Sequence, residues 1–274
     1  MMNLTGFPGF LAVLALCALC TTACDDDVSD PGTREWTLVW QDEFDGPAGQ
    51  RPDSTRWTYD IGTDWGNKQL EYDTDRPSNV SLDGIGNLAI TARREAWLGS
   101  GYTSARIVTR GLFERTYGRY EARIQLPYGP GIWPAFWLLG ANIETTPWPA
   151  CGEIDIMEYR GQEVSTVHGS LHGPGYSAAQ AVTRRFDLDR DRFDTGFHVF
   201  TVEWGADYID WFVDGTHYQR VVPGDLKGPW VFDHPFYIIL NVAVGGGWVG
   251  APTANTKFPQ TMLVDWVRVY EEVS

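Results

Sequence analysis

Tyr120-Glu-Ala-Arg-Ile-Gln-Leu126 alternates strictly between apolar and polar side chains. Apolar residues occupy every second position from Tyr120 to Leu126, and polar ones fill the positions between them. Because successive side chains of a β-strand point to opposite faces, this stretch predicts a strand with one buried and one solvent-facing side.

The same extended pattern recurs along the chain. Leu88, Ile90 and Ala92 repeat it, and further strands are expected at residues 36–40, 132–139, 152–159, 197–204, 207–213, 236–244 and 262–270. Turn or loop signals are Asp214-Gly215 and the Gly/Pro clusters at 127–131, 173–175 and 245–252. We find no amphipathic helical pattern of ten or more residues and no internal repeat. About a dozen strands without helices predict an all-β fold, a sandwich of two antiparallel sheets in one domain over residues 35–274.

Composition narrows the function classes. The chain has 274 residues, 43% of them hydrophobic, which is typical of a globular protein. A formal net charge of −15 argues against nucleic acid as a partner. The 13 tryptophans are unusual, because tryptophan packs in cores and also stacks on flat ligand faces.

The amino terminus has the features of an export signal. Residues 1–24 contain no charged side chain, and the apolar run from Phe10 to Leu19 is too short to span a bilayer comfortably. Thr21-Thr-Ala-Cys24 resembles a bacterial lipoprotein box, in which the Cys is lipidated after cleavage, although Thr21 replaces the usual Leu. Ordinary secretion with cleavage near Ala23 is the alternative. We therefore expect a signal peptide over 1–24, a polar linker over 25–34, and a protein that is secreted or lipid-anchored at the bacterial cell envelope.

The cysteines predict no internal disulfide framework. Cys17 and Cys20 leave with the signal, and Cys24 is the anchor or the first mature residue. Only Cys151 remains in the body, where we interpret it as a small packed residue.

Acidic residues gather in Gly152-Glu-Ile-Asp-Ile-Met-Glu-Tyr159. Glu153 and Asp155 share one face of a strand, whereas Glu158 has the opposite parity. A β-bulge around Met157 would bring Glu158 to the face of the other two. Three acids on one strand repel each other, which suits a catalytic site better than a scaffold. An exposed acidic strand face is the alternative.

Glycoside hydrolysis is the chemistry that this set suits. A retaining mechanism needs an ionised carboxylate and a protonated carboxyl group roughly 5–5.5 Å apart. A flat strand would separate the backbones of Glu153 and Glu158 by about 16 Å. The sheet must therefore be concave, and the bulge must shorten the path. Asp155, between the two, can hydrogen-bond the nucleophile.

Glu153-Ile-Asp-Ile-Met-Glu158 resembles the active-site signature of glycoside hydrolase family 16, in the bulged form of the laminarinase-type endo-β-1,3-glucanases. The resemblance extends over nearly the whole body, through the segments 40–46, 117–123, 131–137, 148–153, 241–248 and 264–270. It implies a concanavalin A-like β-jelly roll with a substrate cleft across the concave sheet. It also implies that Glu153 is the nucleophile, Asp155 its assisting carboxylate, and Glu158 the general acid and then base. The expected reaction is hydrolysis of β-1,3-linked glucans by double displacement.

Several tryptophans are candidate substrate contacts. Trp133 and Trp137 lie four positions apart and so face the same side of a strand, whose other side already has an apolar set. Trp248 lies in a Gly-rich loop where packing partners are scarce, which favours a role as a sugar platform. Core packing is the alternative for each. It is the preferred interpretation for three others that sit in strand patterns: Trp40, Trp211 and Trp266.

Three polar residues complete the expected substrate site. Asn79 matches a sugar-binding position of the family, His172 could flank the acid–base side, and Glu71 is a further candidate. A structural role is the alternative for each.

The resemblance also implies a structural Ca²⁺ on the convex side, held by backbone oxygens of Glu43 and Gly86 and by the side chain of Asp265. No cofactor is expected for catalysis, and no His/Cys pattern has zinc spacing. The expected partner is a β-glucan, and the expected state is a monomer. Two other functions stay open: a β-glucan-binding module without turnover, and a family 16 hydrolase acting on mixed-linkage β-1,3-1,4-glucan or another polysaccharide.

Overall fold

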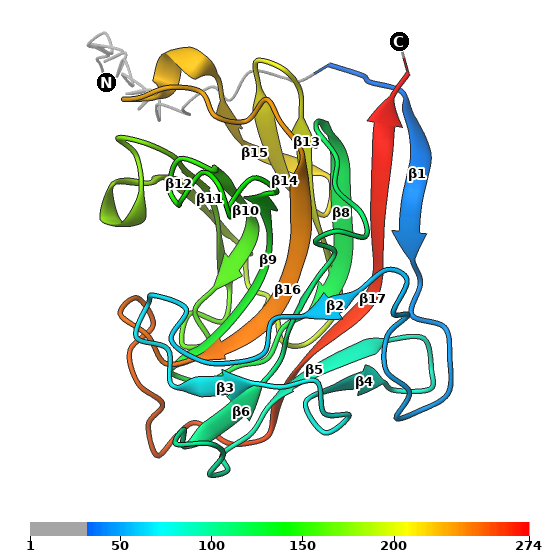
Figure 1. The fold of residues 1–274 in the computed structure, drawn as a ribbon, viewed down its shortest axis with the longest axis vertical. Helices are drawn as coiled ribbons and strands as arrows, with labels where there is room; N and C mark the ends of the chain where they lie inside the picture. Colours follow the sequence, from blue (N-terminus) through cyan, green and yellow to red (C-terminus); the bar gives the residue numbers. More distant parts are fainter. Residues whose placement is uncertain (1–31, 274) are drawn as a thin grey trace, which may run out of the picture.

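The computed structural model describes residues 32–273. The predicted signal peptide, the lipidation site Cys24 and most of the predicted linker lie outside the described residues. Two antiparallel sheets are stacked on each other, which confirms the predicted sandwich (Figure 1). Within the described part, the only helices are two short 3-10 turns, η1 (Ala178–Gln180) and η2 (Pro223–Asp225). None of the described helices is long and apolar enough to cross a membrane.

The outer sheet contains the strand predicted from the alternation that begins at Tyr120. Its order is β15 (Thr216–Val221), β14 (Ile209–Val213), β13 (His198–Trp204), β8 (Gly118–Gln125), β17 (Gln260–Glu272), β5 (Leu88–Ala92) and β4 (Val80–Leu82), and β1 (Trp36–Asp42) also pairs with β17. The predicted turn at Asp214-Gly215 joins β14 to β15, with φ angles of 49° and 79°. Positive φ at both central residues matches the right-handed twist of a hairpin.

The inner sheet positions the site. Its order is β12 (Val182–Asp187), β11 (Thr166–His172), β10 (Glu153–Tyr159), β9 (Ile132–Gly140), β16 (Phe236–Val244), β7 (Arg106–Val108) and β2 (Thr58–Tyr59). Figure 1 shows its long strands bending around an open concave side. A small parallel pair, β3 (Glu71–Asp73) with β6 (Tyr102–Ser104), is the exception to the antiparallel rule.

The main core fills the space between the sheets. Tyr120, Ala122 and Ile124 of β8 are fully buried there, as their alternation predicts. The opposite face of β8 differs from the prediction, because Glu121 is only 7% exposed. Its carboxylate accepts hydrogen bonds from Arg119 and Thr201, so an ion-pair network rather than open water covers this part of the outer face.

Two tryptophans follow the core-packing prediction to different degrees. Trp211 is fully buried, whereas Trp40 is half-buried and stacks on Phe113 with ring centroids 4.9 Å apart. The prediction for Trp266 is wrong: its ring is half-exposed, with the Arg268 guanidinium 4.2 Å above it. The register of β17 shifts between Val264 and Trp266, and this bulge interrupts the alternation on which the prediction rests.

Candidate active site

A bulge in β10 brings the three acids to one face. Asp155 pairs with Trp137 of β9, and the next paired residue, Met157, lies opposite Phe136, so β10 carries one extra residue. The register against β11 shifts over the same stretch. The predicted bulge is therefore confirmed. It turns the side chain of Met157 into the main core and gives Glu158 the same facing as Glu153 and Asp155.

The three carboxyl groups share a poorly hydrated environment. Burial raises the pKa of Glu153, Asp155 and Glu158 to about 8 each. The negative charge of Asp155 contributes to this rise in the pKa of both glutamates. Close acids of this kind retain protons at neutral pH, so the set can offer an acid and a base together.

Each glutamate has its own hydrogen-bond donors. The indole N–H of Trp148 donates to Oε2 of Glu153 over 2.9 Å. The indole N–H of Trp133 donates to Oε1 of Glu158 over 3.2 Å, and the Ser170 hydroxyl donates to Oε2 over 3.3 Å. Different hydrogen-bond donors around two carboxyl groups of one strand can give those groups different chemical roles.

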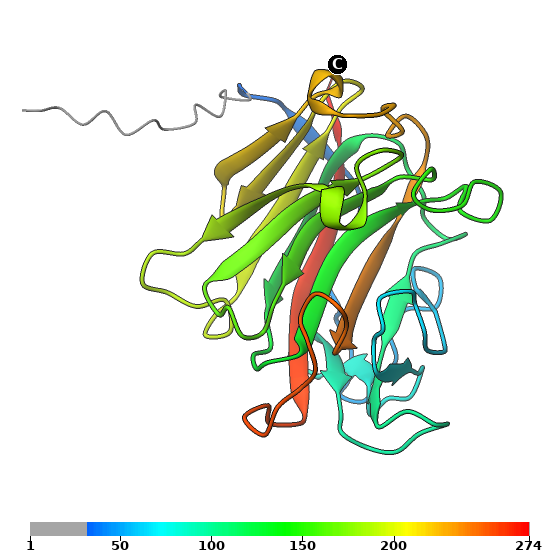
Figure 2. The same ribbon diagram turned by 90° about the vertical axis from the view of Figure 1, so that its left-hand side faces the viewer.

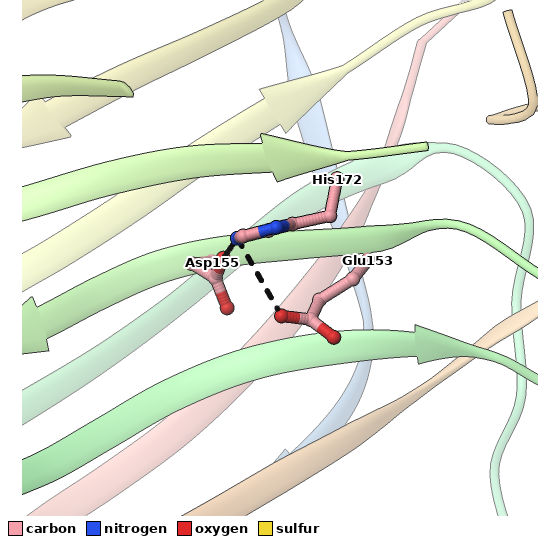
Figure 3. A group of neighbouring side chains, drawn as sticks. All are labelled: Glu153, Asp155 and His172. Atoms are coloured by element: carbon pink, nitrogen blue, oxygen red, sulfur yellow. Dashed lines mark ion pairs between the residues drawn. The ribbon is translucent and has the colours of Figure 1, made fainter. Parts of the chain in front are cut away.

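His172 lies beside Glu153 and Asp155, as Figure 3 shows, rather than on the acid–base side. Its Nε2 is 3.1 Å from Oδ2 of Asp155 and 3.7 Å from Oε1 of Glu153. The predicted side was wrong because β11 runs antiparallel to β10, so its last residue meets the first residue of β10.

The orientation of the imidazole is set by the backbone. The N–H of Ala178 donates to Nδ1 of His172 over 3.1 Å, and a nitrogen that accepts this bond carries no hydrogen. The hydrogen of neutral His172 is therefore on Nε2, facing the carboxylates. Ligand atoms of Glu153, Asp155 and His172 lie within 4.8 Å of one another, a spacing that a metal ion could use. A metal needs the bare Nε2 lone pair, so the Ala178 bond favours a hydrogen-bonding role instead.

Trp133 and Trp137 face the concave side, as their spacing predicts. Both are half-exposed, whereas Phe136 and Leu138, on either side of Trp137, are buried in the core. The Trp137 indole donates to Asn241 Oδ1 over 2.8 Å. These two rings therefore have fixed orientations beside the carboxylates.

Trp248 is less isolated than its Gly-rich surroundings suggest. Its ring packs against Trp133, with centroids 5.3 Å apart, and against His168, at 5.1 Å. The segment that follows β16, in orange in Figure 2, lies in front of the ends of the green strands. Trp248 thus extends the aromatic surface of Trp133 toward β11, which pairs with the acid-bearing strand β10.

Asn79 and Glu71 do not join the site. Asn79 is fully buried, and its amide nitrogen donates to the Thr91 carbonyl and to Thr103 Oγ1, both over 3.0 Å. Glu71 is 1% exposed and accepts the backbone N–H of Val244 over 2.7 Å. Neither side chain offers a surface to a sugar in this conformation. Both expectations rest on the residue type in the sequence, which does not show burial.

Cys151 is fully buried and free, as predicted. It belongs to a second apolar cluster with Leu139 and Tyr237. Leu139 pairs with Glu153 across the sheet, so this cluster supports the Glu153 end of the site from the concave side.

Other residues in the site carry a weak sequence signal or none. Asn241 is the one polar residue of the apolar run Phe236–Val244, a signal that could have identified it. Arg106, from β7, lies with its guanidinium carbon 4.8 Å from the centre of the Trp137 ring. Trp148 and Ser170 reach the glutamates from a loop and from a neighbouring strand, which no local pattern predicts.

The expected calcium positions converge on the outer sheet. Glu43 directly follows β1, Gly86 lies just before β5, and both strands pair with β17, which carries Asp265 at its bulge. The Asp265 side chain is 31% exposed and is paired with Arg123 through Oδ2. Oxygen atoms of this kind are the ligands that Ca²⁺ prefers, whereas the Arg123 guanidinium already compensates the charge of Asp265.

Known proteins resemble this chain closely. Residues 58–268 match the family described as Glycosyl hydrolases family 16. The beta-glucanase of Rhodothermus marinus is 42% identical over 248 residues, which are 87% of this chain and 86% of that protein.

Solved structures show the same relationship. The endo-beta-1,3-glucanase from Pyrococcus furiosus is 46% identical with a TM-score of 0.83, over 88% of this chain and 96% of that one. The catalytic domain of an endo-1,3-beta-glucanase (laminarinase) from Thermotoga petrophila RKU-1 is 44% identical with a TM-score of 0.83, over 88% of this chain and 100% of that one. The match over most of the chain, on a jelly roll whose bulged strand carries three acids, makes this protein a glycoside hydrolase and a member of family 16.

Proposed function

We propose that the chain is a retaining endo-glycosidase that hydrolyses β-1,3-linked glucans. The observation that carries this proposal is the bulge in β10, which places Glu158 on the same face as Glu153 with Asp155 between them. Two carboxyl groups on one face can attack and protonate the same glycosidic bond.

The roles of the acids are those that the family 16 signature implies. Glu153 attacks the anomeric carbon as a carboxylate while Glu158 gives its proton to the leaving oxygen. Glu158, now ionised, then takes a proton from water, and the hydroxyl oxygen releases the sugar from Glu153. Asp155 is buried between them, and its proton can be shared with Glu153, so the total charge of the site changes little during the reaction.

The cleft chemistry favours a neutral polysaccharide. Half-exposed indoles of Trp133, Trp137 and Trp248 provide apolar faces for pyranose rings, and the net charge of −15 opposes the approach of a sulfated polymer. The relatives named above are glucanases, which supports a β-1,3-glucan as the substrate.

The test is the Glu153→Gln protein on laminarin, with release of reducing sugar as the measurement. We expect a loss of nearly all hydrolysis with the fold intact, as judged by circular dichroism. Wild-type activity in this variant would overturn the assignment. A wild-type protein that binds laminarin and releases no product would instead be a binding module, and product release across laminarin, mixed-linkage glucan and agar would define the linkage.

Three further properties belong to the same proposal. Export with a lipid on Cys24 would be detected by the mass of the mature amino terminus. A calcium ion held by Glu43, Gly86 and Asp265 would raise the Tm with Ca²⁺ more than with Mg²⁺. A monomer would show the mass of a single chain in light scattering.

A further inference from the structure

Trp148 holds the nucleophile from outside its own sheet. It lies in the loop between β9 and β10, five residues before Glu153, and donates its indole N–H to Oε2 over 2.9 Å. Its ring also lies against His172, with centroids 6.0 Å apart. The nucleophile is therefore contacted by Trp148 from a loop, and His172 of β11 lies beside both side chains.

Packing in the core does not explain the presence of a tryptophan at position 148. Trp148 is 40% exposed, among the most exposed large apolar side chains of the described residues. A surface indole gains little from packing, whereas a hydrogen bond to a carboxylate in a poorly hydrated site is a strong one. The contact with Glu153 is thus the main interaction that the polar edge of Trp148 makes.

The hydrogen bond from Trp148 gives the two carboxyl oxygens of Glu153 different surroundings. Oε2 is occupied by the indole N–H, and Oε1 faces His172 Nε2 at 3.7 Å without a close donor. Oε1 is therefore the oxygen that is free to attack an anomeric carbon. Oε2 then becomes the carbonyl oxygen of the glycosyl ester, with the indole N–H still directed at it.

We propose that Trp148 is a positioning residue that stabilises Glu153 as the leaving carboxylate in the second half of the reaction. The inference rests on the function proposed above. In the first half, the Oε1–C1 bond forms, the glycosidic C1–O bond breaks, and Glu158 protonates the departing oxygen. In the second half, water adds to C1, its proton goes to Glu158, and the C1–Oε1 electron pair returns to the carboxylate.

The direction of the effect follows from where charge develops. Negative charge leaves Glu153 in the first half and returns to it in the second, so the N–H of Trp148 helps the second transition state relative to the ester. The electrostatics of the free site agree. Burial and the charges of Asp155 and Glu158 raise the pKa of Glu153, while His172 and the Trp148 hydrogen bond lower it.

The test is Trp148→Phe with a 2,4-dinitrophenyl laminari-oligosaccharide, whose leaving group makes the first half fast. We expect kcat to fall about tenfold, the value of one charge-assisted hydrogen bond. KM should fall by a similar factor, so that kcat/KM changes little. Three further results should accompany this fall of kcat and KM at nearly constant kcat/KM. They are a burst of dinitrophenol, a covalent adduct in the mass of the quenched enzyme, and recovery of kcat with azide.

Two controls isolate the N–H group. Benzothienylalanine at position 148 has the shape of tryptophan with sulfur in place of N–H, and it should reproduce the Phe variant even if Phe perturbs the loop. Trp97→Phe removes an indole that is 37% exposed and lies outside the site, and both constants should be unchanged.

A parallel fall of kcat and kcat/KM without an adduct would show a merely structural role and overturn the proposal, as would unchanged constants. These outcomes differ from a failure of the proposed function, in which Glu153→Gln would keep its activity.

Discussion

The indole nitrogen of Trp133 lies 3.2 Å from Oε1 of Glu158, so the same side chain that faces the concave side of the inner sheet also touches the proposed acid. A donor at this position favours the ionised carboxylate and lowers the pKa of Glu158 against the effect of burial. One residue therefore connects the proposed sugar contact to the proposed proton donor.

Trp133→Phe should move the alkaline limb of kcat/KM to higher pH. The loss of the N–H removes an interaction that stabilises ionised Glu158, so its pKa rises and the protonated acid persists further into the alkaline range. The kcat/KM at the pH optimum should still fall, by up to about tenfold, because the smaller phenylalanine ring changes the contact with the sugar and loses the hydrogen bond to Glu158. A pH series on laminarin measures both effects, and an alkaline limb that moves to lower pH would contradict the argument.

The catalytic acids should make the protein less stable as the pH rises. Burial raises the pKa of Glu158 to about 8 from an ordinary value of 4.5, so the folded chain binds more protons than the unfolded chain between these values. The free energy of unfolding then falls as pH increases through this window and is lowest above it. At acidic pH the carboxyl group of Glu158 is protonated in both states, so its ionisation no longer lowers the free energy of unfolding.

Glu158→Gln should accordingly raise the Tm at pH 9 by several degrees and leave it nearly unchanged at pH 4.5. Differential scanning calorimetry of the variant and the wild type at both pH values checks this expectation. Glu35→Gln, at an exposed position just before β1, is the control and should change neither value. Equal shifts at both pH values would point to packing rather than ionisation.

Much of this site could be predicted from residue parity. The alternation in β9 predicts which of its side chains face the concave side, because side chains of a strand alternate with a period of two. In β10, the opposite parity of Glu158 predicts a bulge, because one extra residue moves the following side chains to the other face. Trp148 and the tautomer of His172 could not be predicted, since they depend on how two loops fold back onto β10 and β11. The burial of Asn79 and Glu71 could not be predicted either, because the parallel pair of β3 and β6, which helps to bury them, has no local signature.

Trp248→Ala should weaken substrate binding more than turnover. Its ring packs on Trp133 and His168, and the hydrogen-bond donors to Glu153 and Glu158 are other side chains, so its loss removes apolar surface without removing a donor to an acid. We expect KM for laminarin to rise about tenfold and kcat to change less than about threefold. Steady-state kinetics on laminarin separate the two constants, and a fall confined to kcat would show that Trp248 acts on the chemistry.

Arg34 should contribute to the stability of the outer sheet. Its guanidinium pairs with Glu203 and with Asp210, two carboxylates that are 5% and 0% exposed. Arg34→Ala would remove one cation from this network, while Arg119 still pairs with Glu203 and Arg220 still pairs with Asp210, so the expected loss is about 1 kcal/mol in the free energy of unfolding. Urea denaturation measures the loss, and kcat/KM should be unchanged because these residues lie on the sheet that does not carry the acids.

Glu71→Gln distinguishes a support role from a sugar contact. The carboxylate accepts the N–H of Val244, the last residue of β16 before the loop that carries Trp248, and burial raises its pKa to about 7. A glutamine oxygen can accept the same bond, so KM and kcat on laminarin should stay within about twofold of the wild type.

Because the folded carboxyl group of Glu71 holds its proton to a higher pH than the unfolded one, its ionisation costs stability as the pH rises from about 4.5 through 7. The variant, which cannot ionise, should therefore have a higher Tm than the wild type at pH 9 and an equal one at pH 4.5. A large rise in KM with an unchanged Tm would instead return Glu71 to the substrate site.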